Sequence, residues 1–213
     1  MTNAVTVSSR SREIAGLLLS IGALKLSVTE PFTYASGAKG PIYCDNRVLV
    51  SYPKERRQVI DAMAELVKQE IGPERFDLLA GVSTSGIPFC CWLSDQLDKP
   101  MVYVREAPKE HGLGKRVEGV LRSGQRSVVI EDLVTTGGSA ISTVEGLRNE
   151  GSVVEYCVAI FTYERPAAAT AFTKAGVQLL TLSSIGALLE EAESQGKISG
   201  DEAEEVRSWQ RGF

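Results

Sequence analysis

The chain has few of the residues on which metal centres and disulfide scaffolds depend. Its 213 residues include one histidine and four cysteines. The cysteine spacing matches no zinc motif, and two of the four are adjacent, so we expect free thiols, as in a reducing cytoplasm. A catalytic cysteine would need a nearby histidine, and His111 lies in a polar stretch. These shortages argue against a zinc domain, a disulfide framework and cysteine catalysis.

Long apolar runs and an excess of positive charge are also missing. No stretch reaches the ~20 apolar residues of a membrane span, and residues 1–10 lack the apolar core of a signal peptide. The net charge of −4 disfavours a general nucleic-acid binder, which usually has a basic surface. With 43% hydrophobic residues, the chain is expected to form one α/β domain in the cytoplasm, without nucleic-acid or membrane partners.

Strand and helix patterns alternate through the middle of the chain. Short apolar segments predict strands at residues 77–82, 101–104, 127–130, 153–161 and 177–182. Periodic segments predict helices at residues 11–25, 54–71, 86–97, 138–149 and 167–175, and a charged helical stretch from residue 183. This alternation predicts a mainly parallel sheet covered by helices on both faces.

Ligands of such sheets bind at the carboxyl ends of the strands, so the loops after Val82, Val104, Ile130 and Phe161 are the expected sites. One loop, residues 105–126, is long, rich in Gly, Lys, Arg and Glu, and has no apolar period. A loop of this length in a compact domain is usually a functional lid or a disordered segment.

The segment from Val128 to Ser139 carries the clearest chemical signal. An apolar strand ends in the acids Glu131 and Asp132, and Thr-Thr-Gly-Gly-Ser then leads into a helix. A helix N-terminus with close glycine backbone and hydroxyl donors suits a phosphate, and the acids suit the hydroxyls of a ribose. The alternative is a capped helix beside solvated acids. The segment is neither a Walker A loop nor a dinucleotide fingerprint, because it lacks Gly-Lys-Ser/Thr and G-x-G-x-x-G.

This segment resembles the donor-binding signature of the type I phosphoribosyltransferases. Two further motifs narrow the resemblance to the orotate phosphoribosyltransferases: residues 31–37 with 41–47, similar to that family's N-terminal substrate segment, and Tyr103 to Gly112, similar to its mobile loop. The similarity runs from the first helix to about Arg165. It implies the family's fold, with a small N-terminal hood over residues 1–50, a core over 54–182 and C-terminal helices over 183–213.

The resemblance also implies an activity. The family transfers a phosphoribosyl group from phosphoribosyl pyrophosphate (PRPP) to orotate, with magnesium as cofactor, in pyrimidine (UMP) biosynthesis. Catalytic roles fall on Arg105, Lys109 and Asp132. The residues implied in PRPP binding are Ser83, Thr84, Ser85, Arg105, Lys109, His111, Glu131, Asp132, Leu133, Val134, Thr135, Thr136, Gly137, Gly138 and Ser139. Magnesium is expected to be held mainly through PRPP, and no direct protein ligand of the metal is assigned.

Orotate is expected to contact Ile42, Tyr43, Thr135 and Arg165, the last through its carboxylate. The family's loop reaches across a dimer, so the resemblance implies a homodimer that shares loop 105–126 between subunits. Each site also has a simpler interpretation: a mobile charged loop, a surface arginine, or, for Ser83 to Ser85, an ordinary helix cap.

Three lysines found in some relatives are replaced here by Ala35, Ser85 and Glu106. Compensation by Lys39 or Arg47 is favoured over reduced donor affinity. Two alternative functions stay open at this stage. One is a phosphoribosyltransferase for a purine or another base, which the segment 32–47 argues against. The other is a non-catalytic nucleotide sensor, which has no need for a complete leaving-group loop.

Overall fold

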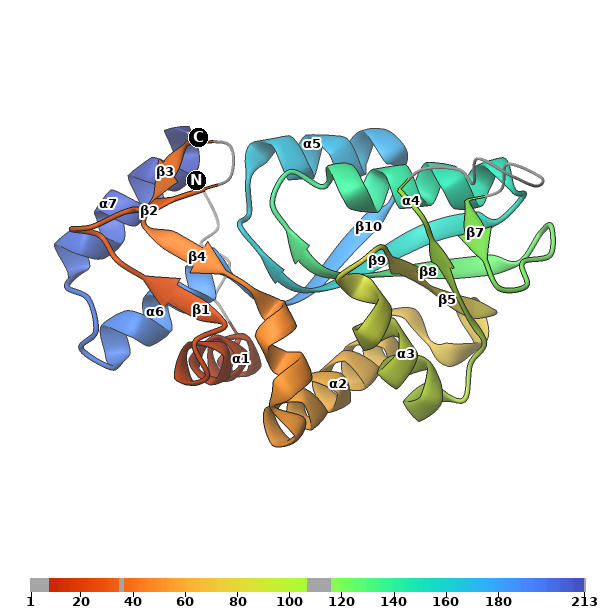
Figure 1. The fold of residues 1–213 in the computed structure, drawn as a ribbon, viewed down its shortest axis with the longest axis horizontal. Coiled ribbons are helices and arrows are strands. Elements are labelled where there is room, and N and C mark those ends of the chain that lie inside the picture. The colour runs from red at the N-terminus through yellow and green to blue at the C-terminus, as the bar shows by residue number, and fades with distance from the viewer. Residues whose placement is uncertain (1–7, 35–36, 107–115, 213) are drawn as a thin grey trace.

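The computed structural model describes residues 8–34, 37–106 and 116–212, which form a central sheet with a smaller lobe beside it (Figure 1). Within these residues the main sheet has the strand order β10-β9-β8-β5-β6-β7. The strands are β5 Leu78–Val82, β6 Met101–Val104, β7 Val117–Glu118, β8 Arg126–Val134, β9 Val153–Thr162 and β10 Gln178–Ser184. Only β6 and β7 pair antiparallel. The prediction of a mainly parallel α/β sheet is confirmed.

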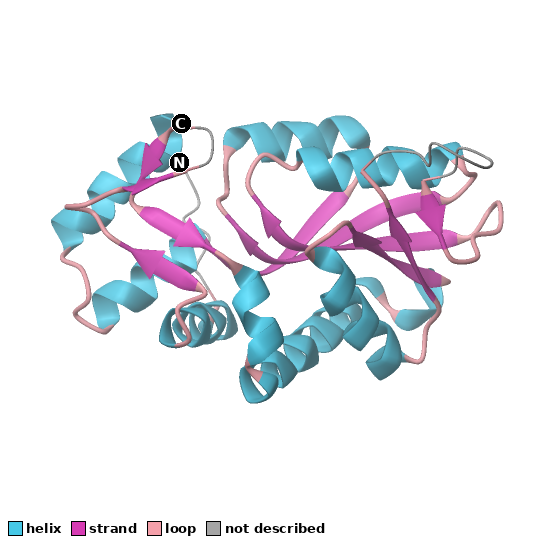
Figure 2. Cartoon of the chain, viewed as in Figure 1, coloured by secondary structure: helices cyan, strands magenta, loops and turns pink. Residues whose placement is uncertain are grey.

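Helices cover both faces of the sheet (Figure 2). On one face lie α4 Gly138–Asn149 and α5 Pro166–Ala175; on the other lie α1 Ser9–Ser20, α2 Pro53–Leu66 and α3 Gly86–Leu97. Successive β8 side chains point to opposite faces, so Val128 and Ile130 belong to one core cluster and Val129 to the other. Burying such a side chain stabilises the fold by ~1.5–3 kcal/mol, which is why this central strand is apolar on both sides.

The smaller lobe is built from both ends of the chain. It contains β1 Leu24–Leu26, β2 Phe32–Thr33, β3 Lys39–Gly40 and β4 Ile42–Cys44, with α6 Ile185–Ser194 and α7 Gly200–Gly212. Strand β1 pairs antiparallel with β4, and β2 with β3. We call this lobe, β1 to β4 with α6 and α7, the hood. The C-terminal helices are therefore part of the hood rather than a separate addition.

Several predicted boundaries agree with the structure. Helices α3 and α4 span residues 86–97 and 138–149, as predicted. The helix predicted at residues 54–71 is α2 followed by a π-helical turn, Val67–Ile71, that ends at Gly72. The C-terminal stretch divides at Gly196, whose positive φ of 65° separates α6 from α7. No described helix is long and apolar enough to cross a membrane.

Three predicted boundaries were wrong. The first helix ends at Ser20 instead of continuing to Lys25, because Gly22 turns the chain with a φ of 73° and Leu24–Leu26 pairs with β4. Strand β8 does not stop at Ile130: it pairs with β9 as far as Val134, so the two acids are strand residues. Part of the predicted loop 105–126 is strand β7, since Val117 is buried and pairs with Val104.

Candidate active site

The carboxyl end of β8 opens into a polar cup at the start of α4. The cup has a volume of about 180 Å³, and its lining residues are Glu131, Leu133, Val134, Thr135, Thr136, Gly137, Gly138, Ser139 and Ala140. Gly137 is left-handed, with a φ of 83°, and a Cβ there would lie 2.9 Å from the Phe172 ring, so only glycine fits. Its carbonyl accepts from the N–H of Ile141, so the cup leads directly into the helix N-terminus, where unpaired N–H groups favour an anion.

Glu131 lines this cup, whereas its neighbour on β8, Asp132, is not among the lining residues. Both are buried, with exposed fractions of 5% and 9%. Burial raises the pKa of Glu131 to about 9, helped by the neighbouring charge of Asp132. Burial also raises the pKa of Asp132. The Asp132 N–H donates to Glu131 Oε1 over 3.1 Å, and the Asp132 carbonyl accepts from Asn46 Nδ2 over 2.6 Å. The pair is therefore held by the backbone of its own strand and by a residue that follows the hood.

The predicted pyrophosphate loop, Ser83 to Ser85, joins β5 to α3 and contains a cis peptide bond between Ser83 and Thr84. A second cavity of about 240 Å³ connects this loop with the cup, because Ser83 and Ser139 both line it. The other lining residues include Glu106 and Arg116. The structure thus brings the loop after β5 and the loop after β8 to the same edge of the sheet.

The base of the predicted lid is held by Arg116, which sequence reasoning missed. Its Nε donates to the carbonyl of Arg105 over 2.8 Å, and its Nη2 donates to Ser142 Oγ of α4 over 2.9 Å. The Arg105 N–H donates to the Arg116 carbonyl, and the Arg105 guanidinium lies 3.7 Å from Glu118. Both ends of the loop are therefore tied together beside the second cavity. Lys109 and His111 lie outside the described residues.

The cations proposed to replace the missing lysines are placed differently. Arg47 forms a two-bond ion pair with Asp45, with its Nε 2.6 Å from Oδ1, and its charge opposes the raised pKa of Asp132. Lys39 lies in β3 of the hood. Arg116 lines the same cavity as Ser83 and is the basic residue of that lining. The sequence held one signal for Arg116: it is a basic residue directly before an apolar residue, Val117, at the end of the predicted loop. Of the replaced positions, Ala35 lies outside the described residues.

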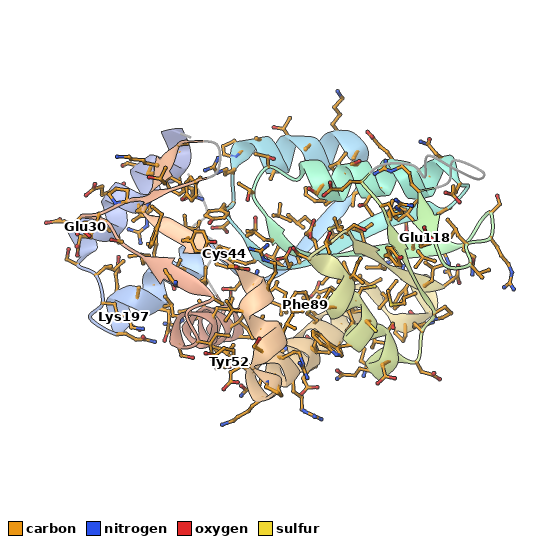
Figure 3. All side chains as sticks on the ribbon, in the orientation of Figure 1. Glu30, Cys44, Tyr52, Phe89, Glu118 and Lys197 are labelled. Atoms are coloured by element: carbon orange, nitrogen blue, oxygen red, sulfur yellow. The ribbon has the colours of Figure 1, made fainter. Side chains whose placement is uncertain are left out.

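A third cavity of about 270 Å³ lies between the hood and the sheet, and it is more apolar than the cup. Its lining residues are Tyr34, Tyr43, Cys44, Leu133, Thr135, Tyr163 and Arg165. Cys44 stands at the end of β4, where the hood meets the sheet (Figure 3). Leu133 and Thr135 also line the cup, so the two cavities are adjacent. An apolar slot with one guanidinium suits a planar, anionic molecule.

Three of the four predicted acceptor residues line this slot: Tyr43, Thr135 and Arg165. The side chain of Ile42 is fully buried in the core and does not line it; its carbonyl accepts from the Tyr34 hydroxyl over 2.5 Å. Tyr34, Cys44 and Tyr163 were missed. Because Tyr34 and Tyr163 are far apart in the sequence, only closure of the hood on the sheet brings them together.

Arg165 is buried, with 6% of its surface exposed, and burial lowers the pKa of its guanidinium. The guanidinium carbon lies 5.9 Å from the centre of the Tyr163 ring and 5.3 Å from that of Trp209. Burial raises the pKa of the Tyr163 hydroxyl and of the Cys44 thiol, so both are neutral near pH 7. The charge of the slot at that pH therefore comes from Arg165.

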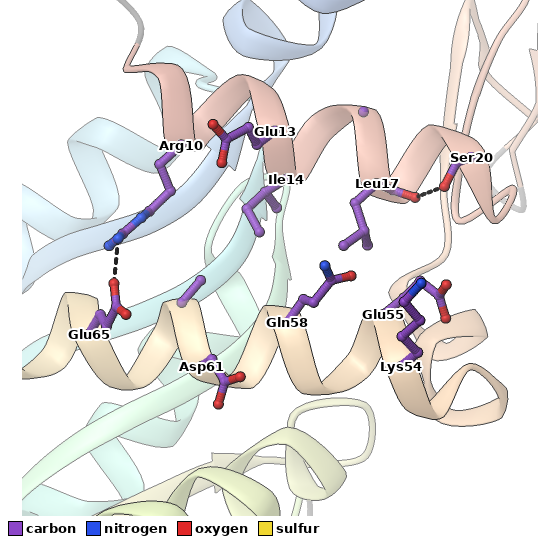
Figure 4. A pocket seen from close by; sticks show the side chains of 12 residues that line it. Arg10, Glu13, Ile14, Leu17, Ser20, Lys54, Glu55, Gln58, Asp61 and Glu65 are labelled. Atoms are coloured by element: carbon purple, nitrogen blue, oxygen red, sulfur yellow. Dashed lines mark hydrogen bonds and ion pairs between the residues drawn. The ribbon is translucent and has the colours of Figure 1, made fainter.

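A larger groove of about 640 Å³ runs between α1 and α2 (Figure 4). Its walls carry charged side chains, among them the ion pair of Arg10 with Glu65. None of the predicted site residues lines it. It lies away from the carboxyl ends of the parallel strands, where ligands of such sheets bind. We therefore assign the candidate site to the cup and the slot.

Comparisons with known proteins identify the family of the chain. Residues 49–178 match the model of the phosphoribosyl transferase domain family. The chain is 43% identical over 203 residues to the orotate phosphoribosyltransferase of Listeria monocytogenes, covering 95% of this chain and 96% of the relative. It is 44% identical over 200 residues to that of Bacillus cereus, covering 94% of each chain. The crystal structure of the Aeropyrum pernix orotate phosphoribosyltransferase superposes with a TM-score of 0.72 at 29% identity, over 87% of this chain and 99% of that one.

Proposed function

The chain belongs to the phosphoribosyltransferase family, and within it to the orotate phosphoribosyltransferases, and from this premise we propose that it transfers a phosphoribosyl group from PRPP to orotate. The products are orotidine 5′-phosphate and pyrophosphate, as pyrimidine (UMP) biosynthesis requires. One observation carries the proposal: the anion cup and the acceptor slot share Leu133 and Thr135. A ribose bound in the cup would present its anomeric carbon to a base in the slot.

The donor is oriented by the cup. The N–H groups at the start of α4 and the hydroxyls of Thr135, Thr136 and Ser139 bind the 5′-phosphate. Glu131 and Asp132 accept hydrogen bonds from the ribose hydroxyls. Burial has already removed water from both carboxylates, so hydroxyl donors placed there lower the free energy of their charged forms.

The leaving pyrophosphate gains negative charge as the glycosidic bond breaks, so cations must face it. Arg105 and Lys109 take this role, with His111 beside them. Arg116 adds a fixed guanidinium where the cavity meets Ser83, and we propose that it compensates for the lysines replaced by Ser85 and Glu106. A closed lid would also exclude the water that could otherwise hydrolyse PRPP.

Magnesium is the proposed cofactor and would enter with PRPP, held mainly by the donor's oxygens. It would neutralise part of the pyrophosphate charge. The acid pair is compatible with a nearby magnesium ion, because a cation stabilises the charged forms of two buried carboxylates whose pKa values are raised. Within the protein, Glu131 and Asp132 would lose the proton that burial holds on the pair.

The acceptor is fixed by the slot. The guanidinium of Arg165 pairs with the carboxylate of orotate, and the rings of Tyr34 and Tyr163 flank the pyrimidine. Thr135 stands where donor and acceptor meet. Tyr43 closes the side formed by the hood. A purine has no carboxylate to offer the guanidinium that lines the slot, which favours orotate as the acceptor.

We also propose that the protein is a cytoplasmic homodimer in which loop 105–126 of one subunit serves the site of the other. Two exposed apolar side chains near the start of α2, Val50 and Tyr52, offer a surface for such contact. Sedimentation at several concentrations would measure the assembly. A monomer with full activity would overturn the shared loop.

The activity is tested by following the loss of orotate absorbance with PRPP and magnesium present. We expect orotate to be consumed, with release of one pyrophosphate for each orotate. Parallel reactions with hypoxanthine and with adenine are the controls. If a purine is consumed and orotate is not, the proposal of orotate as the acceptor is wrong and that of PRPP as the donor stands. If neither is consumed, the proposed function is wrong.

A further inference from the structure

One aromatic side chain of the last described helix, α7, contacts residues that line the acceptor slot. Trp209, on α7, donates from its indole Nε1 to the carbonyl of Lys39 in β3 over 3.2 Å. The ring also covers Gly40, where a Cβ would lie 2.5 Å from the indole and would collide with the Tyr34 hydroxyl. Trp209 therefore locks α7 onto the hairpin that carries Tyr34, one wall of the slot.

The same indole also lies close to the acceptor arginine. The Arg165 guanidinium carbon lies 5.3 Å from the centre of the Trp209 ring, and the Tyr163 ring lies 6.3 Å from it in an edge contact. An aromatic face attracts a guanidinium electrostatically. A guanidinium on a ring face can still donate in its own plane to a carboxylate, which can accept two N–H groups. This geometry is suited to holding a cation that must later pair with an anion.

The backbone before Arg165 is held from the same helix. Gln210 Nε2 donates to the carbonyl of Tyr163 over 3.0 Å and to that of Glu164 over 3.4 Å. Glu164 has a left-handed φ of 50°, uncommon for a residue with a side chain, and its carboxylate accepts from the Gly186 N–H at the start of α6. Both C-terminal helices therefore fix the turn from which Arg165 projects.

We propose that Trp209 is a positioning residue for the acceptor: it holds the Arg165 guanidinium in the orientation that receives the orotate carboxylate, with Gln210 fixing the turn beneath. The proposal rests on the proposed function. It gives the C-terminal helix, which contributes no residue to the lining of the slot or the cup, a part in acceptor binding. None of the slot residues near Trp209 lines the donor cup, so the affinity of the cup for PRPP should not depend on Trp209.

The test separates the two substrates. Trp209→Leu keeps a smaller apolar side chain and removes the aromatic face. We expect the KM for orotate to rise about tenfold while the KM for PRPP changes less than about twofold. Trp209→Phe restores a face but not the N–H, and should recover most of the orotate affinity. The matched control is Trp92→Leu: Trp92 also stacks on an arginine, with Arg56 at 4.2 Å, but on α2 and α3, far from the slot. It should leave both KM values unchanged.

The outcomes are distinct. If the wild-type enzyme consumes orotate and Trp209→Leu leaves its KM for orotate unchanged, or raises both KM values equally, the positioning role is overturned and the function stands. If the wild-type enzyme consumes no orotate, both are overturned. Where Trp209→Leu does not fold, Gln210→Leu takes its place, because it removes only the amide donors. It should raise the KM for orotate alone, and equal KM values in the wild type and this variant would count against the proposal.

Discussion

The two ends of strand β8 carry charge in opposite ways. At its start, Arg126 pairs with Asp77 through two side-chain hydrogen bonds, and this contact lowers the pKa of Asp77 to about 2. At its carboxyl end, Glu131 and Asp132 are buried side by side, and burial raises the pKa of both. The first pair is compensated within the protein. The second is a pair of acids buried away from water, and ionising both of them costs stability until a ligand compensates their charge.

This contrast separates residues that hold the fold from residues reserved for a ligand. A surface ion pair with matched charges contributes little and needs no partner. A buried acid pair lowers stability in the free protein, so its presence at the open end of the sheet is explained by a ligand that compensates it. The strand thus joins a structural end to a functional end within nine residues.

The largest expected effect is at the functional end. Asp132→Asn keeps the size of the side chain and removes its charge, so the ribose hydroxyls lose a charged acceptor. We expect kcat/KM for PRPP to fall about a hundredfold, since hydrogen bonds to charged groups are the strong ones. Circular dichroism should show an unchanged fold. Wild-type kinetics in this variant would contradict the ribose role and weaken the contrast between the two ends.

Glu131→Gln tests the cost of the acid pair directly. A folded-state pKa of about 9, above the unfolded value of about 4.5, means that the folded protein loses stability as pH rises between those values. At about 1.4 kcal/mol for each pH unit above 4.5, the neutral amide should raise the free energy of unfolding by at most about 5 kcal/mol near pH 8 and leave it unchanged near pH 4. Thermal unfolding at both pH values measures this. A variant that is less stable at pH 8 would contradict the argument.

The same variant should bind the donor differently. In the wild type, binding of PRPP with magnesium should release close to one proton near pH 8, because the ligand favours the ionised pair. Calorimetry in buffers of different ionisation enthalpy counts that proton. Glu131→Gln should release no proton when PRPP binds with magnesium. If the variant releases as many protons as the wild type, the proton comes from another group.

Two arginines sharpen the comparison. Arg116 lies beside the cavity shared by Ser83 and Ser139, whereas Arg126 lies at the structural end. Arg116→Gln should raise the KM for PRPP about tenfold, as the loss of one cation near a phosphate implies, and leave the KM for orotate unchanged. Arg126→Gln, the matched control, should change neither. Equal effects of the two substitutions would remove Arg116 from the donor site.

Much of this site could be predicted from the chain. The apolar run of β8, the acids and the glycines after it form one local pattern, so the cup and the bounds of α4 followed from sequence. The slot could not be predicted in this way, because Tyr34 and Tyr163 come together only through the packing of the hood against the sheet. Strand β7 was missed because one buried residue, Val117, makes no periodic pattern. The contact of Trp209 with Arg165 could not be predicted either, because the two residues are far apart in the sequence and no local pattern links them.

The smallest expected effect is at the structural end. Asp77→Asn removes the carboxylate that accepts from the backbone N–H and the guanidinium of Arg126. A folded-state pKa of about 2, below the unfolded value of 3.8, means that the pair contributes its full stability above pH 4 and loses it as pH falls toward 2. The pair is partly exposed, so solvent screening limits the loss in Asp77→Asn to about 0.5–1 kcal/mol near pH 7. Urea unfolding should show this loss at pH 7 and none near pH 2, and the KM values should not change. A large loss of activity would mean that the two ends of β8 are coupled, and that the separation between structural and functional charge does not hold.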